Sequence, residues 1–420
     1  MKTELVAMML ALLLPFHLEW EMPQLAGIKV GTTSLLVGVG LTSIIFRQFL
    51  GYQNKFPRIP CIAPWTLMAI FMCAAYIHSP YFSTELAKMP WHLYRAVLRF
   101  LLVFPLLFLL LKLKGEQLLK KIITLILFAS MLSAMGGIIQ TITATPFRPF
   151  HHGVVSESMV LYSDLFKVDP NTGILRAFGS FTHPNAFAGY LVISLTLTMG
   201  IILFGPKDKL WYLAIISGCV QIIALLFTMS RGGWVAFSSS FLIMASLARQ
   251  KKIIGLGLLF LTITIIIMPS EHKNKFASRA KSISKPSEVQ EFTFRQKRWE
   301  AFFEIAIHNP IVGTGSAVLD NPNEAEIGRT PHNMYLYFAV QNGIPALVLL
   351  AYFMTQLIWR GFNIFERSSD RLQRTLGLGL LGAGIGLVIH GAVDALIGLE
   401  QIWTAFWMLL AMAFFLREKT

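Results

Sequence analysis

The residues best suited to chemistry lie in the stretch RTPHNMYLYFAVQNGIP, residues 329–345, where polar groups interrupt an apolar sequence. Thr330 is a good helix N-cap and Pro331 suits the first helical position, so the pattern predicts a short helix that ends before Gly343. His332 would then lie in the first turn, where the helix dipole disfavours a protonated imidazole. A neutral histidine can accept a proton, so His332 is a candidate general base; a capping or membrane-interface histidine is the structural alternative.

Two further junctions between loops and apolar segments carry basic residues. In SRGGW, residues 230–234, Arg231 stands at the end of an apolar segment, and the glycines would let the backbone approach a ligand closely. In RAFGSFTHPNAFAGY, Arg176 comes shortly before His183 and Asn185 at the start of another segment. Guanidinium groups suit phosphate oxygens, so both arginines are candidate ligands of a phosphorylated substrate. Each is also a residue type that anchors helix ends at a membrane interface.

An amphipathic helix is predicted within RQKRWEAFFEIAIHNP, residues 295–310, which ends at an Asn-Pro pair. Its apolar residues follow helical spacing: Trp299, Phe302, Phe303, Ala306 and Ile307. Because this helix is short and charged on one side, it is expected to lie along a membrane surface rather than to span the bilayer. Arg295 and Arg298 lie over its apolar face at the N-terminal end, where an anion is favoured.

Other ionisable residues give weaker signals. Arg95 and Arg99 are one helical turn apart near the end of an apolar segment, where they either bind lipid phosphate or extend toward the membrane surface. His390 and Asp394 share one helix face in another apolar segment. Ionisable groups inside membrane segments are often functional, but a His–Asp pair can also simply satisfy itself.

No metal site is predicted. The pair His151-His152 and the acidic stretch 320–326 lack the spacing of a metal-ligand set. The three cysteines all fall in apolar segments, where small buried residues without disulfides are expected. A nucleotide-binding glycine motif is also absent, so the sequence indicates no cofactor.

The elements that must position these residues are apolar. The chain has 420 residues, of which 55% are hydrophobic and 14% charged, and its mean hydropathy is +0.61. That balance excludes an ordinary soluble domain and a disordered chain. About twelve segments are apolar and long enough to be candidate spans: residues 5–18, 25–46, 62–79, 93–113, 121–143, 186–204, 210–228, 232–248, 252–268, 344–359, 376–397 and 400–416. The first also resembles a signal peptide, but no small-residue cleavage site follows it. The prediction is an all-α polytopic membrane protein, with residues 1–420 forming a single integral membrane domain.

Lysine and arginine residues set the expected orientation. They are enriched in the short loops on the side of the N-terminus, which predicts that both termini are cytoplasmic. Two long segments, residues 144–185 and 269–333, then face outward; the second starts with a polar stretch, 270–292, expected as a surface loop before the amphipathic helix. Most of the net charge of +14 follows from this topology, and no basic–aromatic motif indicates nucleic acid. Positive charge in the outer segments instead suits an anionic substrate.

Four motifs, in this order, resemble those of the O-antigen ligase and O-antigen polymerase superfamily: FGSFTHPNAFAGYL, SRGGWVA, RQKRWEAFFEIAIHNPIVGTG and TPHNMYLYFAVQNGIPAL. The resemblance covers residues 176–360. It implies a multi-span glycosyltransferase of the GT-C type in the bacterial inner membrane, surrounded by membrane lipid and with its active site on the periplasmic side. Members use a glycan carried on undecaprenyl diphosphate as the donor. Ligases transfer it to a glycolipid acceptor, lipid A–core, whereas polymerases join it to another lipid-linked repeat.

The resemblance also implies roles for single residues. In the ligases, the histidine after the second long loop is proposed as the base that deprotonates the acceptor hydroxyl, and it matches His332. Arginines that match Arg231 and Arg295, and one that matches Arg176, are proposed to hold the donor diphosphate. The reaction would invert the sugar without a metal or a cofactor. Nearby polar residues are candidates for supporting roles: Asn333, Arg329, Arg298, His183, Asn185, Arg95 and Arg99.

Two alternative functions stay open from the sequence. A polymerase of O-antigen or of another surface polysaccharide would carry the same motifs. A transporter of the lipid-linked glycan would also place cations on the outer face. It would be expected to show a two-halves repeat and polar residues at mid-span, and this chain shows neither clearly.

Overall fold

The structure is a computed structural model. It describes residues 3–16, 19–22, 28–31, 36–43, 58–78, 101–145, 174–250, 255, 270–281, 290–315, 330–396 and 399–417. Three of the residues singled out above, Arg95, Arg99 and Arg329, lie outside the described residues. The same holds for His151-His152 and for the acidic stretch 320–326.

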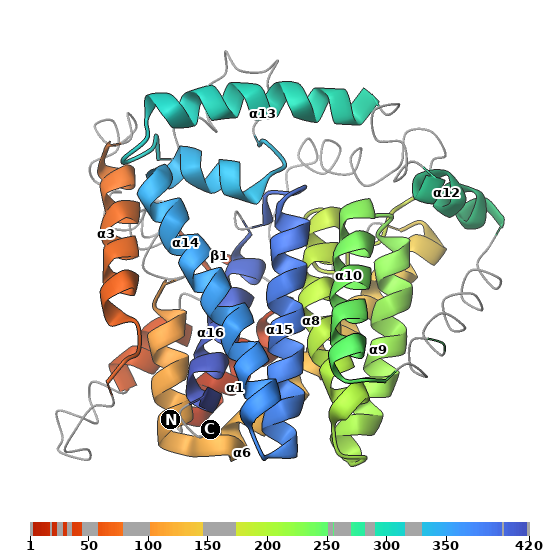
Figure 1. Ribbon diagram of the computed structural model, residues 1–420. Coiled ribbons are helices and arrows are strands. Elements are labelled where there is room, and N and C mark those ends of the chain that lie inside the picture. The colour runs from red at the N-terminus through yellow and green to blue at the C-terminus, as the bar shows by residue number, and fades with distance from the viewer. Residues whose placement is uncertain are drawn as a thin grey trace.

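Helices dominate the described part of the chain (Figure 1). The elements are α1 (Thr3–Leu13), β1 (Glu19–Met22), β2 (Ile28–Gly31), α3 (Ile62–His78), α6 (Val103–Thr143), α8 (Pro184–Phe204), α9 (Lys209–Phe227), α10 (Arg231–Leu247), α12 (Ser270–Lys281), α13 (Gln290–His308), α14 (Met334–Arg367), α15 (Arg371–Gly391) and α16 (Glu400–Arg417). Five of them, α6, α8, α9, α14 and α15, are long and apolar enough to cross a membrane, and α1, α3 and α16 contain shorter apolar helices. The predicted class, a helical polytopic membrane protein, is confirmed.

Two predicted segments differ from the structure. The expected span at 25–46 is wrong at its start, because Ile28–Gly31 forms β2 and pairs with β1 in an antiparallel hairpin. In that pairing Lys29 lies opposite Glu21. The polar stretch 270–292, expected as a loop, contains helix α12. Its alanine, lysine and glutamate residues are good helix formers, and that propensity prevailed over the absence of an apolar stripe.

Helix α6 contains the expected span 121–143 and the later part of the expected span 93–113, joined through a sharp break at Gly115, where φ is 70° and ψ is −158°. The positive φ requires a residue that tolerates the left-handed half of backbone space, which glycine does. Lys114 and Lys121, on either side of the break, lie 3.2 and 3.5 Å from the carboxylate of Glu4 in α1. The break therefore lies beside the start of α1.

Helix α15 runs through the middle of the bundle and packs against α14, α8 and α10 (Figure 1). A Cβ atom added at Gly377 would lie 2.7 Å from the backbone nitrogen of Phe365 in α14, and one at Gly379 would lie 3.0 Å from Cα of Leu197 in α8. Small residues allow helix backbones in membranes to approach closely. These contacts hold α15 closely against α14 and α8.

Helix α13 lies across the bundle at the end opposite the chain termini (Figure 1). It packs on the first segment of α14 through a small apolar cluster: Phe302, Ala306, Ala339 and Val340. Two other members of the predicted stripe, Phe303 and Ile307, are 58% and 49% exposed. The amphipathic helix is thus present, but only part of its apolar stripe packs on the protein.

Helix α14 is broken at Gly343, as the sequence predicts, with φ 82° and ψ 165°. The segment before the break lies across the bundle beneath α13, and the longer segment after it runs obliquely down the bundle (Figure 1). Chain that follows α13 passes the break, where the backbone nitrogen of Ile344 donates to the carbonyl of Pro310 at 2.7 Å. A Cβ atom at Gly343 would collide with the carbonyl of Ile311, so both space and conformation require glycine there.

Candidate active site

His332 lies immediately before α14 rather than in its first turn. The helix begins at Met334, and its N-cap is Asn333, whose Oδ1 accepts two backbone N–H groups of the first turn, both at 3.0 Å. The predicted cap at Thr330 is therefore wrong, because a second good capping residue lies closer to the apolar run. His332 itself has a left-handed backbone with φ 48°, a region in which histidine occurs more often than most residues.

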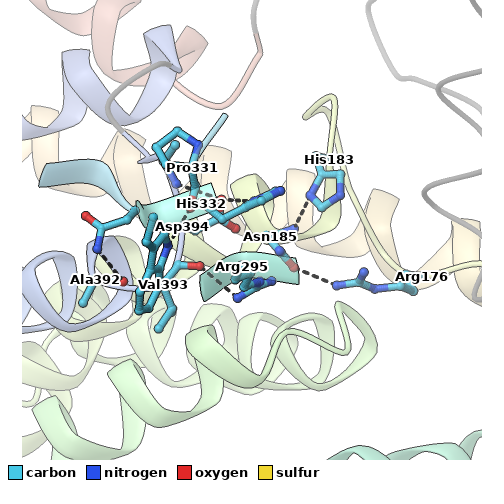
Figure 2. A network of polar contacts seen from close by, with 12 residues as sticks. Arg176, His183, Asn185, Arg295, Pro331, His332, Ala392, Val393 and Asp394 are labelled. Carbon is cyan, nitrogen blue, oxygen red and sulfur yellow. Dashed lines mark hydrogen bonds and ion pairs between the residues drawn. The ribbon is translucent and has the colours of Figure 1, made fainter. Parts of the chain in front are cut away.

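The imidazole of His332 faces Asp394, which follows α15 in the chain (Figure 2). Its Nδ1 lies 3.5 Å from Asp394 Oδ1, which is within ion-pair reach but longer than a strong hydrogen bond. The side chain of His332 is 29% exposed and that of Asp394 is 15% exposed. Neither His332 Nδ1 nor Asp394 Oδ2 has a hydrogen-bond partner among the described residues. The histidine is therefore backed by a carboxylate while part of its ring remains accessible.

Three histidines influence the Asp394 carboxyl. Burial alone raises its pKa, but the neighbouring His332, His390 and His183 outweigh burial and hold the pKa well below its ordinary value. Asp394 is therefore a carboxylate at neutral pH. The sequence pairs it with His390 alone, because the expected segment 376–397 would place both on one helix face, but α15 ends at Gly391, before Asp394. Its contact with His332 joins distant parts of the chain, and no local pattern predicts it.

His390 is buried near the end of α15, with 1% of its surface exposed. A Cβ atom at Gly232 in α10 would lie 3.0 Å from His390 Cδ2, and one at Gly189 in α8 would lie 3.5 Å from its Nδ1. The imidazole thus fits between two helices that each offer a glycine. The first glycine of SRGGW, predicted to admit a ligand, makes room for His390 and for Val393.

Helix α13 brings Arg295 to the same region (Figure 2), and Trp299 of the same helix bonds there too. Arg295 Nη1 donates to the carbonyl of Val393, next to Asp394, at 3.1 Å. Trp299 Nε1 donates to the carbonyl of Pro331, next to His332, at 2.7 Å. Arg298 is also partly buried, and its Nε has no hydrogen-bond partner among the described residues. Arg295 and Trp299 therefore contact the residues that directly precede Asp394 and His332.

Arg176 lies deeper than the other arginines, with 7% exposure. Its Nε donates to the carbonyl of Thr228 at 2.8 Å, and its Nη2 donates to Asn185 Oδ1 at 2.8 Å (Figure 2). Asn185 in turn donates its backbone N–H to His183 Nδ1 at 3.1 Å, and His183 is the N-cap of α8. Arg176 thereby joins the start of α8 to the turn before α10.

Arg231 is the first residue of α10. The N-cap before it is Ser230, whose Oγ accepts the backbone N–H of Gly233 at 3.3 Å. The residue after it, Gly232, packs on His390. The backbone of Arg231 is thus fixed beside the turn that contains Asp394.

The structure brings together several of the candidate residues that it describes. His332, Arg295, His183, Asn185 and Arg176 lie in one polar region, and Asp394 joins them as the residue whose role the sequence did not identify (Figure 2). Within the described ranges, no group of three His, Cys, Asp or Glu side chains is arranged to hold a metal ion.

These features define the class: a helical membrane protein with a histidine–carboxylate pair and several arginines at one end of its bundle. Residues 212–351, which include Arg231, Arg295 and His332, match the family model described as O-antigen ligase. An O-antigen ligase from Salmonella typhimurium is 26% identical over 210 residues, which cover 47% of this chain and 51% of that relative. The match therefore spans about half the length of the curated relative. Both comparisons support the O-antigen ligase superfamily.

Proposed function

We propose that this protein is a glycosyltransferase of the bacterial inner membrane that moves a glycan from undecaprenyl diphosphate to a hydroxyl of lipid A–core. The reaction takes place on the periplasmic side, at the end of the bundle that α13 covers. The proposal is supported by the two comparisons with O-antigen ligases. The observation that carries it is the His332–Asp394 pair, with its 3.5 Å contact and its neighbouring arginines.

In this mechanism His332 is the general base. Asp394 faces Nδ1, which leaves Nε2 of the neutral imidazole to take the proton of the acceptor hydroxyl. The acceptor oxygen forms a bond to the sugar C1 while the bond between C1 and the diphosphate oxygen breaks, with inversion. The carboxylate stabilises the imidazolium that results, because opposite charges lie close together in a largely buried site.

The arginines act on the leaving group. Undecaprenyl diphosphate leaves as an anion, so it requires neutralising charge rather than a proton. Arg231 and Arg295 hold the diphosphate oxygens, and Arg298, whose Nε has no partner among the described residues, supports them. Arg176 supports the same site indirectly, because two of its donors already bind Thr228 and Asn185 and so fix the segments that surround the site.

The first test replaces the base. His332→Ala should lower turnover about 10²–10⁴-fold, the usual worth of general base catalysis, while the lipid-linked donor still binds. The assay uses purified protein, lipid-linked donor and lipid A–core, with turnover expressed per folded molecule. Wild-type turnover in His332→Ala would show that the base lies elsewhere. Loss of the wild-type reaction on addition of EDTA would contradict a metal-independent mechanism.

The second test identifies the acceptor. After deletion of the protein, surface glycan is separated on a gel. A ligase predicts lipid A–core without glycan and polymer retained on the lipid carrier. Single repeats attached to the core would instead identify a polymerase.

A further inference from the structure

Asn333 makes three hydrogen bonds with one side chain. Its Oδ1 accepts the backbone N–H groups of Tyr335 and Leu336, and its Nδ2 donates to the carbonyl of Ala392 at 3.2 Å. The first two bonds cap α14, and the third reaches the residue that follows α15. A single amide therefore joins the start of one helix to the end of another.

These bonds close a small ring around the proposed catalytic pair. His332 precedes Asn333 in the chain, and Asp394 is two residues after Ala392 (Figure 2). The ring consists of the His332–Asn333 peptide, the Asn333–Ala392 hydrogen bond, the chain from Ala392 to Asp394, and the contact between Asp394 and His332. The amide hydrogen bond is the only link in this ring, apart from the ion-pair contact itself, that is not covalent.

We propose that Asn333 is a positioning residue that sets the distance between His332 and Asp394. The inference rests on the proposed function, because it assigns a role within the same His–Asp pair. The left-handed backbone of His332 makes such a support necessary, since the residue lies outside the helix and has no helical hydrogen bonds of its own to orient it.

The chemistry of the side chain explains why asparagine is suited to this position. Serine, threonine and aspartate cap helices about as well, but they offer an acceptor without a donor that extends away from it. An amide has its acceptor and its donor on different atoms, so its oxygen can accept two N–H groups while its nitrogen donates to a carbonyl on another helix. A residue selected for capping alone would not need the second function.

The test compares wild type with Asn333→Ser, Asn333→Asp and Tyr335→Phe. Serine keeps a capping oxygen but cannot reach Ala392, and aspartate keeps the cap but turns an oxygen toward the carbonyl of Ala392. In both Asn333 variants we expect kcat per folded molecule to fall about tenfold to a hundredfold, with an unchanged KM for the lipid-linked donor. Tyr335→Phe is the matched control, because it removes another bond between the same two helices, from Tyr335 to the carbonyl of Val388 at 2.8 Å, without opening the ring.

A double-mutant cycle with Asp394→Asn separates positioning from general stability. If Asn333 acts through Asp394, Asn333→Ser should lower kcat far less when Asp394 is already asparagine. Independent, multiplicative effects would overturn the proposal, as would a wild-type kcat in Asn333→Ser or an equal loss in Tyr335→Phe. His332→Ala is measured alongside. An active His332→Ala protein defeats the proposed base, whereas an inactive one beside a fully active Asn333→Ser protein defeats only the positioning role.

Discussion

At the scale of single residues, the arginines of the site differ in how deeply they are buried. Arg176 is buried and gives two donors to Thr228 and Asn185. Arg231 begins a helix at the edge of the site and is partly exposed. A buried guanidinium group that donates to protein acceptors stabilises the fold, whereas a partly exposed one can also be reached by an anion from outside. The two residues should therefore fail in different ways when they are replaced.

Arg231→Lys tests the diphosphate contact. Lysine keeps the charge but loses the planar fork, so we expect turnover to fall about tenfold to a hundredfold, as for the loss of one charge-assisted hydrogen bond. The apparent melting temperature in detergent should stay near that of wild type. Arg176→Lys is the comparison, and there the melting temperature should fall. Equal melting temperatures for both variants, together with equal turnover, would remove the distinction between the two arginines.

At the scale of elements, α14 shows what the sequence could and could not predict. Its break is predicted correctly, because Asn342-Gly343 followed by Pro345 is a strong local signal. Its start is misplaced, because Thr330 and Asn333 both suit an N-cap and only the packed structure decides between them. Local signals thus define most helices and their breaks, while the choice between equivalent signals depends on packing.

The site shows the same limit more sharply. The sequence identifies His332 and the arginines as residue types, but not the pairing of His332 with Asp394. That pairing arises because α14 and α15 pack closely along glycine-lined contacts, which brings the start of one beside the end of the other. The periodicity of apolar residues describes the faces of single helices, so it cannot predict a contact between the ends of two helices.

Gly343→Ala tests the break in α14. The residue has φ 82°, and a Cβ atom there would collide with the carbonyl of Ile311. We expect destabilisation of at least about 1–3 kcal/mol from the backbone conformation alone, seen as a lower melting temperature in detergent. Gly255→Ala is a suitable control, since a Cβ atom at that position would meet nothing within 4 Å. A Gly343→Ala protein as stable as the control would show that the break can relax without cost.

At the scale of the whole molecule, the candidate site and the chain termini lie at opposite ends of the bundle. The termini lie at the end opposite α13 (Figure 1). The break in α6 lies at that opposite end too, because Lys114 and Lys121 contact Glu4 near the start of α1. Which of these two ends faces the cytoplasm stays a prediction from the charge pattern of the sequence.

Cysteine labelling tests that orientation. In a protein whose native cysteines are replaced by alanine, Glu304→Cys on α13 should react with a membrane-impermeant thiol reagent in cells with a permeabilised outer membrane. Lys120→Cys, beside the break in α6, should react only after the inner membrane is lysed. Both positions are exposed, so burial does not account for a difference. The reverse labelling pattern would show that the protein has the opposite orientation in the membrane.

The break in α14 also bears on how a lipid-borne substrate would meet the site. Below the break, Ile344, Val348 and Tyr352 are exposed along one side of the helix, and above it the chain leads directly to His332. A polyprenyl tail that lay along this side would have its head group at the level of the break. Donor and enzyme would then meet by diffusion within the plane of the membrane. The length of the polyprenyl tail would not change the depth in the membrane at which the sugar reaches the site.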